Sequence, residues 1–262
     1  MNNDGPIGIF DSGVGGTSIW KEINSLMPFE DTIYLADSKN APYGHKTQDE
    51  IIALSIKNTE KLISLGSKII VVACNTATTN AIEILRSSYQ IPFIGIEPAI
   101  KPAALQTKTG YIGILATKGT LRSSLFSKTS GFYAKNKHIV EIIGEGLVSL
   151  IENGKINSKE MSELLNFYLE PMLKYNVDYL VLGCSHYPYL IPQIKKILPE
   201  KVIIIDSGEA VARQTKLVLM QNKLLAENIT PTLLFYSNFN TATLKEMMKS
   251  YKDLVQISYL DF

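Results

Sequence analysis

Three things are scarce in this sequence, and each scarcity excludes a class of protein. There are two cysteines in 262 residues, the formal net charge is only +1 (26 basic and 25 acidic side chains), and apolar runs such as Ile69–Ala73 are no longer than a strand. Two cysteines make no disulfide scaffold. A balanced charge lacks the basic stripe of a nucleic-acid or membrane-surface binder. A membrane span needs about 18 or more apolar residues. We therefore expect no nucleic-acid partner and no membrane association.

The start of the chain also lacks a basic and then apolar leader, because an aliphatic run begins by Ile7. Few cysteines and no secretory signal are typical of the reducing cytoplasm, where thiols stay free. The composition, 45% hydrophobic and 19% charged, is that of an ordinary globular protein. We expect a cytoplasmic protein with one large or two small domains.

Short aliphatic runs alternate with longer stretches of helical period, a pattern typical of parallel, doubly wound sheets. Strands are expected at Ile7–Phe10, Thr32–Ala36, Ile69–Ala73, Phe93–Ile96, Tyr111–Leu115, Ile139–Ile143, Tyr179–Leu182 and Val202–Ile205. Helices are expected between them, for example at Thr47–Leu65, Thr76–Ser88, Ser158–Tyr175 and Gly208–Gln221.

An internal repeat divides the chain. Ile7-Gly-Ile recurs 105 positions later as Ile112-Gly-Ile, and the aliphatic run before Cys74 recurs 110 positions later before Cys184. A helical stretch and another strand follow each cysteine, and an acid comes 23 and 22 positions after it. The repeat predicts two similar doubly wound α/β domains related by a pseudo-two-fold, with the active site in the cleft between them.

We place the first domain at residues 1–96 plus 209–262 and the second at 97–208. The proline-containing segment Gly95–Pro102 would join them. A late strand at Leu233–Tyr236 would return the chain to the first domain.

Cys74 and Cys184 both lie where an aliphatic strand ends and a helix is about to begin. Ligands bind at the carboxyl ends of strands in such sheets, and a helix N-terminus lowers the pKa of a thiol. Most single cysteines are inert core residues, but two in equivalent positions of a repeat, followed by Asn75-Thr76 and Ser185-His186, favour a paired acid and base. A disulfide is disfavoured by the cytoplasmic context, and a zinc site by the lack of a Cys-x-x-Cys motif.

Other polar groups follow the strands. The turn Asp11-Ser-Gly-Val-Gly-Gly16 matches neither the dinucleotide fingerprint nor a P-loop. Two interpretations remain: the N–H groups of the turn could bind a carboxylate, or Asp11 could be an ordinary turn residue. Tyr43 and Gly44 lie in a turn that could contact a polar ligand. His186 could assist proton transfer or be structural. The hydroxyls of Thr117 and Thr120 follow a strand, where they could meet a carboxylate.

The strings FDSGVGG, NAPYG, ACNTAT, ATKGT, GCSHYP and IDSG occur in this order between Ile7 and about Gly208. Together they resemble the glutamate racemases. The family's second cysteine motif usually reads G-C-T-H-Y/F-P, and Ser185 replaces that threonine with another hydroxyl, so the contact should be slightly altered rather than lost.

The resemblance implies an isomerase that interconverts L- and D-glutamate without a cofactor or metal and supplies D-glutamate for peptidoglycan. Cys74 and Cys184 would exchange protons with the two faces of the α-carbon, assisted by Asp11 and His186. Substrate-binding residues carried over by motif are Asp11, Ser12, Tyr43, Gly44, Asn75, Thr76, Ser185 and His186. Glu152 falls near an assisting carboxylate of some members. The resemblance also implies a homo-oligomer, a dimer.

Three alternatives remain open at this point. A related racemase could act on aspartate or hydantoins, since loop contacts decide the substrate. A two-lobed binding protein could use the cysteines as cleft lining. A cysteine hydrolase needs only one Cys-His pair and leaves the second cysteine unexplained.

Overall fold

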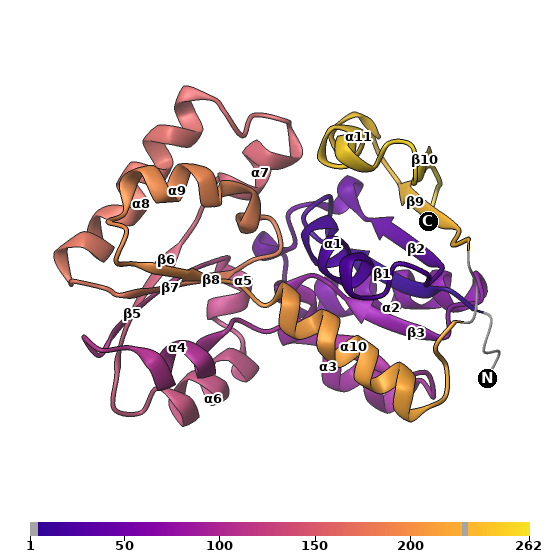
Figure 1. Cartoon of the computed structure of the whole chain (residues 1–262), viewed down its shortest axis with the longest axis horizontal. Coiled ribbons are helices and arrows are strands. Elements are labelled where there is room, and N and C mark those ends of the chain that lie inside the picture. The colour runs from indigo at the N-terminus through magenta and orange to yellow at the C-terminus, as the bar shows by residue number, and fades with distance from the viewer. Residues whose placement is uncertain (1–4, 227–229) are drawn as a thin grey trace.

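The computed structural model describes residues 5–226 and 230–262, which form two parallel sheets. The six-stranded sheet has the order β10-β9-β2-β1-β3-β4 and the four-stranded sheet the order β6-β5-β7-β8 (Figure 1). The strands are β1 Ile7–Asp11, β2 Thr32–Ala36, β3 Ile69–Val72, β4 Phe93–Gly95, β5 Tyr111–Ala116, β6 His138–Ile143, β7 Tyr179–Gly183, β8 Ile203–Ile205, β9 Leu233–Ser237 and β10 Gln256–Tyr259.

Helices connect the strands and cover the sheets (Figure 1). They are α1 Thr17–Leu26, α2 Gln48–Ser64, α3 Asn75–Ser88, α4 Ile100–Gln106, α5 Lys118–Leu121, α6 Ser124–Tyr133, α7 Leu147–Glu152, α8 Lys159–Lys174, α9 Ile191–Ile197, α10 Gly208–Gln221 and α11 Ala242–Met247. Short 3₁₀ turns lie at Ser38–Asn40, Tyr43–His45, Tyr187–Leu190 and Lys249–Tyr251. The boundaries follow local chemistry: α2 begins at a capping box in which Thr47 and Glu50 satisfy each other's backbone N–H groups.

The central strands of both sheets are buried on both faces. In β3, Ile69 and Val71 belong to the core that contains α1 and α10, whereas Ile70 and Val72 belong to the core that contains α2 and α3. Strands buried on both faces are aliphatic at every position rather than at alternate ones. This burial explains why the strands are recognisable as continuous apolar runs in the sequence.

The two sheets share one topology. The order β2-β1-β3-β4 in the larger sheet corresponds to β6-β5-β7-β8 in the smaller, with all pairs of described strands parallel. The predicted fold class, two similar doubly wound α/β units, is confirmed. The equivalence also pairs β3 with β7, which are the strands that precede Cys74 and Cys184.

Two features complete the larger sheet and its connection to the smaller one. Strand β9 pairs in parallel with β2, and β10, which the sequence analysis does not predict, pairs with β9. The two chain segments that pass between the sheets meet where Ser207 Oγ donates to the carbonyl oxygen of Glu97. Within the described residues, no helix combines the length and apolarity that a bilayer span requires.

Candidate active site

The two cysteines lie at equivalent strand ends and are almost fully buried. Cys74 lies two residues after the end of β3 and is the N-cap of α3. Its sulfur accepts a hydrogen bond from the backbone N–H of Ala77 at 3.4 Å and lies 3.6 Å from Ser12 Oγ. Cys184 directly follows β7, and its sulfur lies 3.8 Å from His186 Nδ1. Both thiols are free. The arrangement brings a hydroxyl to one thiol and an imidazole to the other.

The helix N-terminus acts on Cys74 in the expected direction, but other effects on the pKa of this thiol are larger. Burial, and then the negative charge of Asp11, raise the pKa of the Cys74 thiol well above its ordinary value. The hydrogen bond from Ala77 at the start of α3 acts in the lowering direction, but desolvation of a buried thiolate outweighs it. Burial therefore favours the protonated form of the Cys74 thiol.

Asp11 organises the turn after β1. Its Oδ2 accepts from the backbone N–H groups of Gly13 (3.2 Å) and Gly16 (3.1 Å), and its Oδ1 accepts from Ser185 Oγ (3.0 Å). The carboxyl group is fully buried, and this burial raises its pKa although His186, Gly16 and Ser185 act to lower it. Asp11 thus joins the turn of the larger sheet to the residue after Cys184.

His186 contacts an acid through its other ring nitrogen. Its Nε2 lies 2.6 Å from Glu152 Oε1, while Nδ1 faces Cys184. Burial alone would lower the pKa of His186, but hydrogen bonds with Cys184 and Glu152 and the charge of Asp11 raise it well above its ordinary value. Glu152 is therefore a site residue, and its pairing with His186 orients the imidazole toward the thiol.

On the Cys74 side, three hydroxyls converge. Thr76 Oγ1 lies 2.8 Å from Thr117 Oγ1 and 3.3 Å from Thr120 Oγ1, and the latter two lie 3.1 Å apart. Gly44 packs directly on this group, since a Cβ there would lie 2.8 Å from Thr117 Cβ. Beside them Asn75 is 2% exposed, and neither polar atom of its side-chain amide has a hydrogen-bond partner among the described residues.

The hydroxyl of Tyr43 takes part in a buried hydrogen-bond network. Its side chain is buried, donates to Asp37 Oδ2, and accepts from Asn58 Nδ2 at 3.0 Å. Asp37 Oδ1 also accepts from Asn40 and from Asn238, which follows β9. The network fixes the loop that carries Gly44. Asp37 has no motif-like signal of its own, so the sequence analysis misses it.

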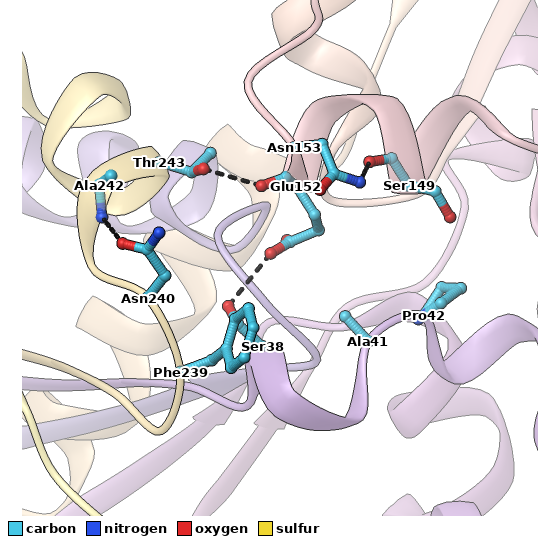
Figure 2. A pocket seen from close by; sticks show the side chains of 10 residues that line it. All are labelled: Ser38, Ala41, Pro42, Ser149, Glu152, Asn153, Phe239, Asn240, Ala242 and Thr243. Carbon is cyan, nitrogen blue, oxygen red and sulfur yellow. Dashed lines mark hydrogen bonds between the residues drawn. The ribbon is translucent and has the colours of Figure 1, made fainter.

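A cavity of about 390 Å³ lies on the outer side of Glu152. Its walls come from three segments far apart in the sequence: 38–42, 149–153 and 239–243 (Figure 2). Figure 2 shows Ser38 and Thr243 pointing to Glu152. Neither residue carries a sequence signal for this contact, because it forms only when the two sheets come together.

No group of three or more histidine, cysteine or acidic side chains within the described ranges is arranged to hold a metal ion. The groups gathered in the site are two thiols (Cys74 and Cys184), the imidazole of His186, two carboxyl groups (Asp11 and Glu152), the unpartnered amide of Asn75 and the threonine hydroxyls.

The family model for Asp/Glu/hydantoin racemases matches residues 7–215. The chain belongs to this racemase family. The matched range contains both cysteines and every site residue named in the sequence analysis.

Individual members of the family confirm the resemblance to glutamate racemases. The chain is 46% identical to the glutamate racemase of Herpetosiphon aurantiacus over 85% of this chain and 87% of that one. Among solved structures, it is similar to Escherichia coli glutamate racemase in complex with L-glutamate and an activator, UDP-MurNAc-Ala (TM-score 0.86, 31% identity, 98% of both chains). It is also similar to the Francisella tularensis enzyme in complex with D-glutamate (TM-score 0.84, 28% identity, 99% and 98% of the chains).

Proposed function

We propose that this racemase interconverts L- and D-glutamate without a cofactor, with Cys74 and Cys184 as the two proton carriers. One thiolate removes the α-proton while the opposite thiol donates a proton to the other face of the α-carbon. The observation that carries the proposal is the placement of two buried thiols at the ends of equivalent strands, β3 and β7, in two sheets of the same topology.

The groups around Cys74 are suited to an amino-acid substrate. Asn75 offers an unpartnered donor and acceptor, and the hydroxyls of Thr76, Thr117 and Thr120 can turn their protons toward a carboxylate. The first N–H groups of α3 add a partial positive charge at the same place. A substrate carboxylate would satisfy these donors, and the substrate ammonium group would satisfy the Asn75 acceptor.

In this proposal the substrate ammonium group contributes to the electrostatics of the thiols. Burial and the charge of Asp11 raise the pKa of the Cys74 thiol. A substrate ammonium group would place a positive charge near the thiol, which favours the thiolate form. In the proposal Asp11 and His186 assist the two thiols, Asp11 beside Ser12 and Ser185, and His186 beside Cys184. The dry site then stabilises the charge that develops at the α-carbon.

The decisive assay follows circular dichroism of L-glutamate and, separately, L-aspartate in D₂O with no added pyridoxal phosphate. We expect loss of the glutamate signal and deuterium at the α-carbon of the product, with aspartate unchanged. Turnover of aspartate in preference to glutamate would contradict the substrate assignment. Glutamate bound without turnover would instead support a binding protein.

Each thiol is tested by its own substitution. Cys74→Ser and Cys184→Ser should each abolish racemisation, because a serine hydroxyl is too weak an acid to replace a thiol in proton exchange. Full activity of either variant would remove the two-thiol mechanism.

The cellular setting belongs to the same proposal. We infer a cytoplasmic homodimer that supplies D-glutamate for peptidoglycan, which the resemblance to glutamate racemases supports. Rescue of a D-glutamate auxotroph by the gene tests the role, and sedimentation velocity tests the dimer. No growth without added D-glutamate, or a single monomeric species, would contradict the respective part.

A further inference from the structure

Glu152 accepts hydrogen bonds from three separate chain segments that belong to the half of the molecule with the larger sheet. Its Oε1 accepts from the backbone N–H of Val14 at 2.7 Å, its Oε2 accepts from Ser38 Oγ at 3.1 Å, and its backbone carbonyl accepts from Thr243 Oγ1 at 2.7 Å (Figure 2). Glu152 itself ends α7, which follows β6 of the smaller sheet. This residue is therefore a junction between the two halves of the molecule.

The close approach is built into the turn after β1. A Cβ at Gly13 would lie 2.0 Å from Glu152 Oε1, so a side chain at this position is incompatible with the contact. The carboxylate thus lies directly against the backbone of the turn. Its side chain is 13% exposed, whereas that of His186 is 1% exposed, so Glu152 lies at the boundary between the buried site and the outer cavity.

Thr243 and Ser38 are fixed relative to each other. Asn238, just after β9, accepts from the backbone N–H of Lys39 at 3.0 Å and donates to Asp37, on either side of Ser38. Asn240 then accepts from the N–H of Ala242 at 2.8 Å, which starts α11 and orients Thr243. The C-terminal segment and the 38–40 turn therefore present their two hydroxyls to Glu152 as one unit.

Glu152 transmits this restraint to the reacting group. Its Oε1 lies 2.6 Å from His186 Nε2, and the opposite ring nitrogen lies 3.8 Å from the Cys184 sulfur. A carboxylate at Nε2 retains the proton there and leaves Nδ1 to the thiol. If Glu152 moves away, the orientation of the imidazole and its proton position are no longer fixed.

We propose that Thr243 is a positioning residue for the reaction: by binding the Glu152 backbone it holds the Glu152 carboxylate against His186 when the two halves are closed. The inference rests on the proposed function, since it concerns the proton chemistry of Cys184. It assigns a role in the reaction to the C-terminal segment 238–243, which lies outside the range matched by the family model.

The test compares Thr243→Val, Thr243→Ser and Thr241→Val. Valine has the shape of threonine but no hydroxyl, whereas serine retains the donor. Thr241 precedes the same helix, and its side chain makes no capping hydrogen bond, so Thr241→Val is a matched control. We expect Thr243→Val to lower kcat/KM for glutamate by about twofold to tenfold, the contribution of one such hydrogen bond. Thr243→Ser and Thr241→Val should remain near the wild-type value.

A double-mutant cycle separates positioning from a general structural effect. If Thr243 acts through the Glu152 carboxylate, Thr243→Val should cause no further loss of kcat/KM in a Glu152→Ala background. Thermal unfolding of each variant shows whether it is folded at the assay temperature. Equal activity of Thr243→Val and Thr241→Val, or a fully additive loss in the Glu152→Ala background, would overturn the inference.

These outcomes are distinct from failure of the proposed function. If the wild-type protein neither racemises glutamate nor exchanges its α-proton, the proposed function fails before any variant is compared. If wild-type racemisation is present and the cycle is additive, only the positioning role of Thr243 fails.

Discussion

Ser185 donates a hydrogen bond to Asp11 across the two sheets, with 3.0 Å between Ser185 Oγ and Asp11 Oδ1. Both residues are buried. The contact connects the residue after Cys184 to the turn that carries Ser12, the neighbour of Cys74. The two thiol environments are therefore coupled through one hydroxyl and one carboxyl group.

Replacement of Ser185 should show how much its hydroxyl contributes to stability and to activity. Ser185→Ala removes a donor that lowers the pKa of Asp11, so that pKa should rise further and the buried carboxyl group should lose a partner. We expect the free energy of unfolding to fall by about 1–3 kcal/mol and kcat to fall with it. Ser185→Thr keeps the donor and should retain most activity. Denaturant unfolding measures the loss of stability, and the racemisation assay measures the loss of kcat. A fully active Ser185→Ala variant would contradict the coupling of the two thiol environments through Ser185 and Asp11.

Glycine at position 15 is required by His186. A Cβ there would lie 2.2 Å from His186 Nδ1, which is too short for any real contact. We expect Gly15→Ala to displace the imidazole and reduce kcat by at least about tenfold, since proton transfer by a positioned side chain contributes about 10²–10⁴-fold. The control is Gly131→Ala in α6, where nothing lies within 4 Å of the added Cβ and alanine should stabilise the helix by about 0.5–1 kcal/mol. Similar kcat values for the two variants would refute the steric argument.

The sequence is sufficient to predict the strands that hold the site. Runs such as Thr32–Ala36 and Ile69–Val72 are buried on both faces, so their boundaries are visible as changes in composition. Strand β10 is missed because only one of its four residues is even partly buried, and its partner β9 supplies the pairing. An exposed edge strand of this kind has no apolar pattern to recognise.

The same distinction applies within the site. The repeat and the motifs predict the two thiols, the Asp11 turn and the Asn75-Thr76 pair, because each follows directly from a strand end. Ser38 and Thr243 are not predictable, since their contacts with Glu152 join segments that are distant in the sequence. The role of the Tyr43 hydroxyl depends on Asp37 and likewise requires the folded chain.

A buried ion pair lies at the end of the larger sheet that is opposite the two thiols. Lys68 Nζ lies 2.7 Å from Glu30 Oε2, and both side chains are nearly inaccessible. Lys68→Met leaves a buried carboxylate without this cation, so we expect a loss of about 3–5 kcal/mol in unfolding free energy. Adding Glu30→Gln to that variant should recover part of the loss, because the uncompensated charge is then removed. Urea unfolding tests this; a loss unchanged in the double variant would show that the charge is not the cause.

The reactivity of Cys74 should depend on pH in the direction set by its surroundings. Burial and the charge of Asp11 raise the pKa of its thiol, so at pH 8 the thiolate fraction in the ligand-free protein is smaller than for an ordinary cysteine. Alkylation by iodoacetamide, followed at the Cys74 peptide by mass spectrometry, should therefore keep accelerating above pH 9. Asp11→Asn removes the neighbouring negative charge and should move the rise to lower pH. A rate that levels off near pH 9 in the wild-type protein, as for a free cysteine peptide measured in parallel, would contradict a raised pKa.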